Sequence, residues 1–549
     1  MKKFLCLSLA AVVLFGALFG CGKKTSQQNA AANDALQTPT GVSVSLGEKP
    51  DSMLPAYAVG DNQSYVYHLF EGLYRYDETG AVASGAAETE IVDESGRVWT
   101  FTIRSDARWS DGEPVRAQDF VYAWRRAVSP DAQSPYASLF LMIENAGSIL
   151  EGWSDPSALG VEAVSDSELR VTFAQPVWRV SSILAHQAFS PLREDLAEDY
   201  FPENSAVDYK NIVTNGAYTV YSFDDRETVF ARNDQYYLSQ NVANNTLRFR
   251  FFEQTDRFDA FEGEEINFAA APGQDAVTAL YGVDKSGLSG VTGYDLTYAA
   301  LNNASPLFCD ASVRRAFVLS VRQSDLCAAL LDQGMPAGGL VSDAFGGADS
   351  QKSSFRDDAD SLLCSDAAYA ENLLLAKQLL SDAGFADPAD FPTVTIVYDK
   401  DNALHAAAAK SLAQCWRERL SIDVQSEGLD AETLSETLRN GSADIAIVTR
   451  ECAVDRPSVI LNAFVTGANA NAAHYSSLAY DAALSAAANA GEFSAQYAQY
   501  HAAESALLSD AGVAPLFFSR ELFLQNERLQ NVVTPAPNAF LFTWADSSD

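Results

Sequence analysis

Residue types that could support catalysis are present in this sequence, but they are not spaced as catalytic motifs. The chain contains no G-x-S-x-G, no H-E-x-x-H and no Walker loop, the patterns that place a nucleophile, a zinc ion or a phosphate. Pairs of carboxylates carry no information among 73 acidic residues. We therefore expect a protein without enzymatic activity, cofactor or bound metal, and a secreted hydrolase is a weaker alternative. The five histidines are scattered without metal-ligand spacing, at positions 68, 186, 405, 474 and 501.

Cysteine could supply a metal ligand, a redox pair or a disulfide, and here its spacing favours none of these. No two of the seven cysteines form a C-x-x-C pattern, so a zinc site or a dithiol motif is not predicted. Cys6 and Cys21 lie near the N-terminus. The other five are an odd number, so at most two disulfides could form and we expect none; they are Cys309, Cys327, Cys364, Cys415 and Cys452.

Cys21 stands where an apolar leader ends. Met1-Lys2-Lys3 precedes an apolar run from Phe4 to Phe19, which is too short for a comfortable membrane span. The run ends in Leu18-Phe19-Gly20-Cys21, which resembles the lipobox of bacterial lipoproteins; an ordinary signal peptide with an incidental cysteine is the alternative. The resemblance implies a signal peptide over 1–20 and an acylated, for example palmitoylated, Cys21 anchored in the cell membrane. Residues 21–40 lack periodicity and predict a flexible tether.

Composition limits the possible partners. A length of 549 residues allows roughly three or four domains, and 48% apolar residues can fill sizeable cores. The net charge of -36 repels phosphate backbones and anionic headgroups, so nucleic acid is excluded as a partner. We expect a soluble body outside the cytoplasm.

Local patterns predict the elements that must position any binding residues. Trp99, Phe101 and Ile103 alternate with polar residues over Val98–Arg104, which predicts a half-buried strand. A turn-rich run with Gly112 and Pro114 follows. A helix is predicted next, and its apolar positions are Phe120, Val121, Trp124, Ala127 and Val128.

Elsewhere the patterns predict a mixed α/β protein. Tyr65, Leu69 and Leu73 predict a helix ending near Gly72, and 246–253 predicts a strand with Leu247, Phe249 and Phe251 inward. From residue 394 strands and helices alternate, which favours α/β packing. The longest predicted helix there, 403–420, carries an i+4 stripe of Leu404, Ala408, Leu412, Trp416 and Leu420.

Several blocks in order resemble one known family. DARWSDGEPVRAQDFVYAWRRAV closely resembles a characteristic segment of the oligopeptide-binding proteins, which are the solute-binding subunits of peptide ABC importers (bacterial solute-binding protein family 5). Further blocks agree: HLFEGLYRYDETG, SPYASL, KNIVTNGAYTV, VRRAFVLSVRQSDL and AHYSSLAYDAAL. The resemblance covers about residues 42–540.

The resemblance implies a two-lobed α/β fold like that of periplasmic binding proteins (type II, cluster C), with an extra domain on lobe I and a ligand cleft between the lobes. By position, lobe I comprises 40–70, 195–294 and 521–549. The extra domain is 71–194 and lobe II is 295–520. Hinge closure around the ligand belongs to this class of motion.

A binding protein for peptides of any sequence must grip the backbone and neutralise the charged ends. A buried unpaired ammonium costs several kcal/mol, so the family places an Asp at the amino end. Here the corresponding run is Arg450-Glu451-Cys452-Ala453-Val454-Asp455-Arg456-Pro457, and Asp455 is the candidate. Val454 occupies the simplest aligned position, and Glu451 stands where an aromatic residue is usual. Alternatively, Asp455 only pairs with neighbouring Arg456.

The other ligand positions are partly altered. His405 matches a family His that meets the peptide carboxylate, or it is a surface residue of its helix; Tyr136 matches a stacking Tyr, or it belongs to the core. Leu331 and Ile447 replace cations of the family, for which Arg450 could compensate, and Ala58 replaces an acid. The residues expected at the ligand are Asp455, Arg450, Glu451, Cys452, His405, Arg439, Tyr136, Val59, Gly60 and Tyr294.

The resemblance thus predicts a lipid-anchored, monomeric solute-binding protein that captures peptides, in particular oligopeptides, and passes them to the permease and ATPase of an ABC importer. A receptor for signalling peptides or for a non-peptide solute on the same fold is the alternative. This sequence matches the family more closely in the scaffold than at the ligand positions. The fold alone therefore does not decide between a peptide importer subunit and a receptor.

Overall fold

The computed structural model describes residues 41–203, 205–271, 277–278, 287–331, 333–347, 354–358, 366–537 and 539–547. The predicted leader and tether, with Cys21, and also Cys364, lie outside the described residues. The helices of the described part are α2 (Gln63–Leu69), α3 (Ala117–Val128), α4 (Ala146–Leu150), α5 (Val180–Leu184), α6 (Ala197–Tyr200), α7 (Gln254–Glu262), α9 (Ala311–Leu319), α10 (Gln323–Ala329), α11 (Tyr369–Asp382), α12 (Ala403–Leu420), α13 (Ala431–Asn440), α14 (Pro457–Leu461), α15 (Leu478–Ala488) and α16 (Phe493–Ser509).

A large mixed sheet connects most of the chain. In the described residues it has 11 strands, in the order β15-β14-β16-β12-β17-β11-β1-β10-β9-β8, with β13 also paired to β17. Its strands are β1 (Val42–Gly47), β8 (Tyr218–Phe223), β9 (Glu227–Arg232), β10 (Thr246–Phe251), β11 (Phe268–Ala270), β12 (Leu288–Leu301), β13 (Gly334–Pro336), β14 (Val394–Asp399), β15 (Val424–Leu429), β16 (Ile445–Arg450) and β17 (Ala514–Gln525).

The remaining strands form smaller antiparallel sheets. One has four strands in the order β4-β5-β7-β6, and the pairs β2-β3, β18-β21 and β19-β20 complete the described set. These strands are β2 (Tyr74–Tyr76), β3 (Val82–Ser84), β4 (Ala87–Val92), β5 (Val98–Ile103), β6 (Val161–Ser165), β7 (Glu168–Thr172), β18 (Leu529–Gln530), β19 (Val533–Ala536), β20 (Ala539–Leu541) and β21 (Asp546–Ser547).

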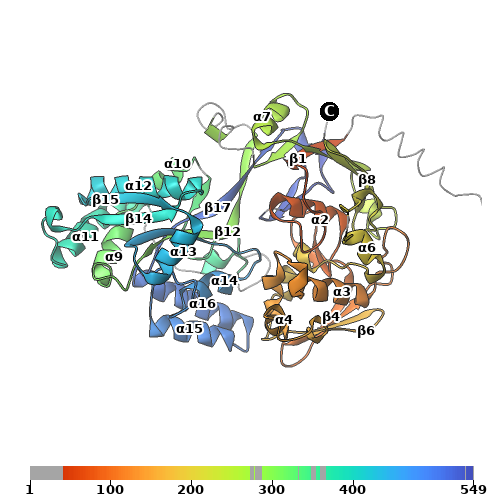
Figure 1. Cartoon of the computed structure of the whole chain (residues 1–549), viewed down its shortest axis with the longest axis horizontal. Helices are drawn as coiled ribbons and strands as arrows, with labels where there is room; N and C mark the ends of the chain where they lie inside the picture. Colours follow the sequence, from red (N-terminus) through yellow and green to blue (C-terminus); the bar gives the residue numbers. More distant parts are fainter. Residues whose placement is uncertain are drawn as a thin grey trace, which may run out of the picture. The chain divides into compact units, whose positions relative to one another are not determined.

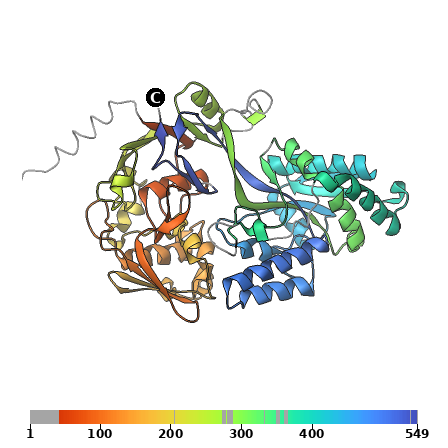
Figure 2. The ribbon, with the colours of Figure 1, turned by 180° about the vertical axis from the view of Figure 1, so that it is seen from behind.

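Buried side chains separate into two groups along the chain. The first core is built from residues 42–270 together with a few from 523–545. The second core is built from residues 294–518. Both faces of β12 are buried in the second core: Tyr298 lies on one face and Leu301 on the other, as expected for a strand covered on both sides. Figures 1 and 2, seen from opposite sides, show the long strands β12 and β17 running side by side between the two groups of elements.

The second core contains the α/β alternation that the sequence predicts. Strands β14, β15 and β16 are parallel, with α12 connecting β14 to β15 and α13 connecting β15 to β16. Helix α12 has the predicted bounds, and Trp416 of its apolar stripe is fully buried against Phe317. Parallel neighbours need such crossover helices, because a tight turn cannot join them.

The block that identified the family lies in the first core. Strand β5 pairs with β4 and β7, and α3 packs on the same small sheet, so the predicted strand, turn and helix are confirmed. The predicted helix near residue 65 is also present, but it ends at Leu69 rather than near Gly72. The reason is that the next segment is bound by another loop: Gly216 N–H donates to Leu69 O (2.8 Å), and Asn215 Nδ2 donates to Glu71 O (2.8 Å).

The start of α3 is stabilised more directly than the sequence indicates. Arg116 is the N-cap residue of α3, and an arginine side chain has no acceptor for the first N–H groups of a helix. In the structure Asp119 is buried and accepts hydrogen bonds from the Arg116 backbone N–H (2.9 Å) and from Trp109 Nε1 (3.0 Å). A carboxylate at this third helical position therefore provides half of a capping box and also ties the preceding turn to the helix.

Asp119→Ala should consequently lower the free energy of unfolding by about 2 kcal/mol, since two buried donors lose their acceptor. Urea denaturation followed by tryptophan fluorescence measures the change, with Trp109 as a neighbouring reporter. Asp131→Ala, at an exposed acid after the same helix, is the matched control. Equal shifts in the two variants would contradict the proposed role of Asp119.

Candidate functional site

A cavity of about 310 Å³ has walls from both cores. The lining from the chain of the first core is Tyr76, Gly80, Ala81, Val82, Arg179, Ser182 and Pro535. The lining from the chain of the second core is Tyr294, Asp343, Ala344, Phe345, Gly346, Ser354 and Asp455. A cavity shared in this way changes whenever the two parts of the chain move relative to each other.

An ion pair across this cavity joins the two cores. Arg179 precedes α5 in the first core, Asp455 precedes α14 in the second, and Arg179 Nη2 lies 2.8 Å from Asp455 Oδ2. The other oxygen, Oδ1, accepts from the Gly346 backbone N–H at 3.1 Å. Burial raises the pKa of Asp455, and the Arg179 charge and the Gly346 N–H oppose that rise. The expected alternative partner, Arg456, is not the one that Asp455 pairs with.

The turn that presents Asp455 is held by Cys452. Its backbone N–H donates to Asp295 Oδ1 (2.8 Å) and its Sγ donates to Val454 O (3.1 Å). Burial raises the pKa of Cys452 to about 12, so the thiol stays protonated and is a poor nucleophile. Glu451 beside it is exposed. Tyr294 is buried against Phe345, with ring centroids 4.6 Å apart, and forms an aromatic wall of the cavity.

A second, larger cavity of about 840 Å³ brings Arg439 and Arg450 together. Arg439, on α13, is exposed. Arg450, at the end of β16, is half-buried and donates from Nε to Val459 O (3.1 Å). The loop 466–476 closes the other side. Two guanidinium groups that line one cavity suit a carboxylate, which they can bind by charge-assisted hydrogen bonds.

His405 lies behind this cavity rather than in it. Its Nε2 is 2.8 Å from Thr449 Oγ1, and Thr449 Oγ1 is 2.8 Å from Thr297 Oγ1. The side chain is 7% exposed, so the alternative of a surface histidine is wrong. Burial lowers the pKa of His405, which keeps the imidazole neutral at pH 7. It can therefore orient the Thr449 hydroxyl but cannot supply a positive charge.

Five other expected ligand residues line neither of these two cavities in the described structure: Glu451, Cys452, Tyr136, Val59 and Gly60. Tyr136 is 8% exposed and packs on His186, with ring centroids 5.0 Å apart. Val59 is 50% exposed in an extended conformation. Gly60 has φ +56, and no atom lies within 4 Å of where its Cβ would be. Val59 and Gly60 are both exposed at the start of the turn before α2.

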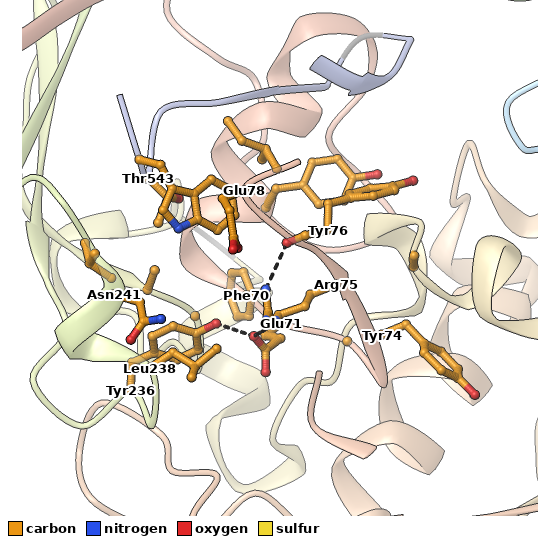
Figure 3. Close-up of a pocket in the computed structure, with 18 of the residues that line it drawn as sticks. Phe70, Glu71, Tyr74, Arg75, Tyr76, Glu78, Tyr236, Leu238, Asn241 and Thr543 are labelled. Atoms are coloured by element: carbon orange, nitrogen blue, oxygen red, sulfur yellow. Dashed lines mark hydrogen bonds and ion pairs between the residues drawn. The ribbon is translucent and has the colours of Figure 1, made fainter. Parts of the chain in front are cut away.

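A third cavity, of about 60 Å³, lies within the first core next to Glu71 (Figure 3). The Tyr236 hydroxyl donates to the Glu71 carboxylate, and Arg75 Nε is 4.0 Å from it. Burial raises the pKa of Glu71 to about 7, although Tyr236 and Arg75 oppose the rise. This cavity is too small for a peptide. The Asn215 side chain also binds the backbone of Glu71, so we regard the residues around this cavity as structural.

Arg179 lines the cavity between the two cores but was not predicted from the sequence. It stands in PVWRVSS, away from every block that resembles the family. Tyr76 and Phe345 were also missed, although Tyr76 lies inside the block HLFEGLYRYDETG. The local sequence offers only a cation next to a single aromatic residue, Trp178, and this pattern does not indicate which residue the cation pairs with.

Among the residues that the structure describes, no cluster of His, Cys, Asp or Glu is arranged to hold a metal ion. The cysteines at 309, 415 and 452 are free there. None of the described helices combines the length and apolar character that membrane crossing requires.

The amino-acid sequence is similar to those of known peptide-binding proteins. The periplasmic oligopeptide-binding protein OppA of Haemophilus influenzae is 30% identical over 492 residues, which cover 86% of this chain and 87% of that protein. OppA of Escherichia coli is 29% identical over 509 residues, covering 89% and 90%.

Structure comparison supports the same grouping. The unliganded open form of the periplasmic murein tripeptide-binding protein MppA matches with a TM-score of 0.80 at 24% identity, covering 92% of this chain and 97% of that one. This confirms the expected two-lobed α/β fold. The family model described as "Bacterial extracellular solute-binding proteins, family 5 Middle" matches residues 81–472. The chain therefore belongs to the bacterial extracellular solute-binding proteins of family 5.

Proposed function

We propose that this protein captures peptides outside the cytoplasm and delivers them to an ABC importer. The observation that carries the proposal is the cavity shared by the two cores, which holds a buried charge pair and aromatic walls. A cleft of this kind can enclose an extended peptide when its two sides close. The protein acts as a binding subunit without catalysis or cofactor, and as a monomer.

The lobes follow the two cores. Lobe I comprises 40–70, 195–294 and 521–549, with the extra domain 71–194 attached, and lobe II comprises 295–520. Supporting this division, the C-terminal segment is bound to the first core: the Phe542 N–H donates to His68 Nε2 (3.0 Å). The paired strands β12 and β17 then provide the hinge.

The two cavities serve opposite ends of the ligand. At the amino end, Asp455 and Tyr294 line the cavity, Glu451 and Cys452 belong to the turn that presents Asp455, and Tyr136 lies outside the lining. Arg439 and Arg450 bind the carboxylate end, and His405 acts there through Thr449. The exposed backbone of Val59 and Gly60 offers hydrogen bonds to the peptide main chain, which suits oligopeptides of varied sequence.

Ligand that co-purifies with the protein from its own host should consist of peptides, and calorimetry with a mixed peptide library should show binding. Mass spectrometry of the denatured protein identifies the co-purified material. Protein in which both Arg439 and Arg450 are changed to Gln should retain less of every peptide, while Arg528→Gln, at an exposed site far along the chain, should not. Recovery of only a non-peptide solute, with no binding from the library, would refute peptide capture.

Membrane attachment completes the proposal. Cys21 becomes the acylated N-terminus once residues 1–20 are removed, and 21–40 tether the binding body to the outer side of the cell membrane. The strong negative charge of the body keeps it off an anionic lipid surface, so the tether leaves the cleft open to solvent.

A further inference from the structure

We propose that Arg179 occupies the place of a ligand's α-ammonium group, so that this site selects peptides whose amino terminus is acylated over the same peptides with a free terminus. This inference rests on the proposed peptide capture. It names the ligand class, and it makes Arg179 the residue that determines specificity at the amino end.

Each oxygen of the carboxylate that could bind an ammonium group already has a partner. Asp455 is only 10% exposed; its Oδ2 is paired with Arg179 and its Oδ1 accepts from Gly346. A free peptide terminus would have to displace the guanidinium from this pair. Because removing one partner from a buried ion pair leaves the other charge unpaired, such a displacement is costly.

Arg179 has a second hydrogen-bond partner besides Asp455. Its Nη2 donates to Ser182 Oγ (3.3 Å) as well as pairing with Asp455, and the side chain is 19% exposed. The guanidinium lies directly against Gly346, where an added Cβ would be 2.0 Å from Nη1. The pair therefore depends on the absence of a side chain at position 346.

The remaining walls suit an uncharged end group. Tyr76, Tyr294 and Phe345 supply aromatic surface, and Pro535 and Val82 add apolar surface. Asp343 is the other carboxylate in the lining, but it is exposed, so its charge is well hydrated and attracts an ammonium only weakly. An acyl group can bury its apolar part against the rings, and its carbonyl adds no charge beside Arg179.

The test uses the full-length protein in detergent and a library of tri- to hexapeptides that is half N-acetylated, with each sequence present in both forms. Mass spectrometry measures the ratio of acetylated to free peptide retained. The wild-type protein should favour the acetylated form by roughly tenfold or more. A ratio at or below one, with peptides retained, would overturn the inference and leave peptide capture standing. Retention of no peptide would overturn both.

Two independent variants should reverse the preference. Arg179→Gln removes the guanidinium, and Gly346→Ala pushes it off Asp455; each should shift the ratio at least tenfold toward free peptides. Gly338→Ala is the matched control, because nothing lies within 4 Å of a Cβ at that position. In the double variant Arg179→Gln/Asp455→Asn the gain for free peptides should disappear. An unchanged ratio in folded Arg179→Gln protein would refute the role of Arg179.

Discussion

Replacement of Asp455 by Asn is expected to weaken peptide binding about a hundredfold, equivalent to about 2.7 kcal/mol. In the proposed function, peptide capture brings together the two parts of the chain that carry Arg179 and Asp455, and in the structure their contact leaves the guanidinium 19% exposed. Without the carboxylate this positive charge is buried unpaired, and truncating one partner of such a pair costs about 2–5 kcal/mol. Asn keeps an oxygen for the Gly346 N–H, so the substitution isolates the charge from the local hydrogen bond.

Calorimetry with the tightest peptide recovered from the host measures this change, and Asp382→Asn, on an exposed acid of α11 in the same lobe, is the control. Arg179→Gln/Asp455→Asn should recover part of the lost affinity, since the buried unpaired charge is gone. That recovery defines a coupling between the two residues. If the Asp455→Asn variant bound this peptide with wild-type affinity, the ion pair between Arg179 and Asp455 would not contribute to peptide binding.

Cys21→Ser is expected to move the protein from the membrane fraction to the soluble fraction almost completely. Buried acyl chains contribute about 0.8 kcal/mol per CH₂, and stable anchoring takes more than one chain. A serine in this place cannot carry the thioether-linked lipid or permit the same processing. None of the helices that the structure describes is both long and apolar enough to cross a membrane.

Cell fractionation followed by immunoblotting distinguishes the outcomes, together with metabolic labelling by a palmitate analogue. Cys6→Ser is the matched control, because Cys6 lies within the leader that is removed. The wild-type and Cys6→Ser proteins should both be labelled and sediment with membranes. Labelled Cys21→Ser protein, or unlabelled protein that remains membrane-bound, would contradict lipidation at Cys21.

The sequence alone predicted those features that depend on neighbours along the chain. The alternation at Val98–Ile103, the apolar stripe of α3 and the bounds of α12 are set by periods of two and 3.6 residues, which local backbone geometry imposes. Family resemblance added the two-lobed fold. Local prediction was wrong for the helix that ends at Leu69. There the backbone is bound by a loop that is distant in sequence, because the Gly216 N–H donates to the Leu69 carbonyl.

The binding site was predictable only in part, because its decisive partners are remote in sequence. Asp455 was found by its position beside Pro457, and Tyr294, Arg439 and Arg450 also reach cavity walls. The burial of His405 and the pairing of Asp455 with Arg179 could not be read from any local pattern. A buried ion pair forms between charged side chains that the tertiary structure places close together and away from water. Only the tertiary structure therefore shows that the Asp455 carboxylate is paired with Arg179.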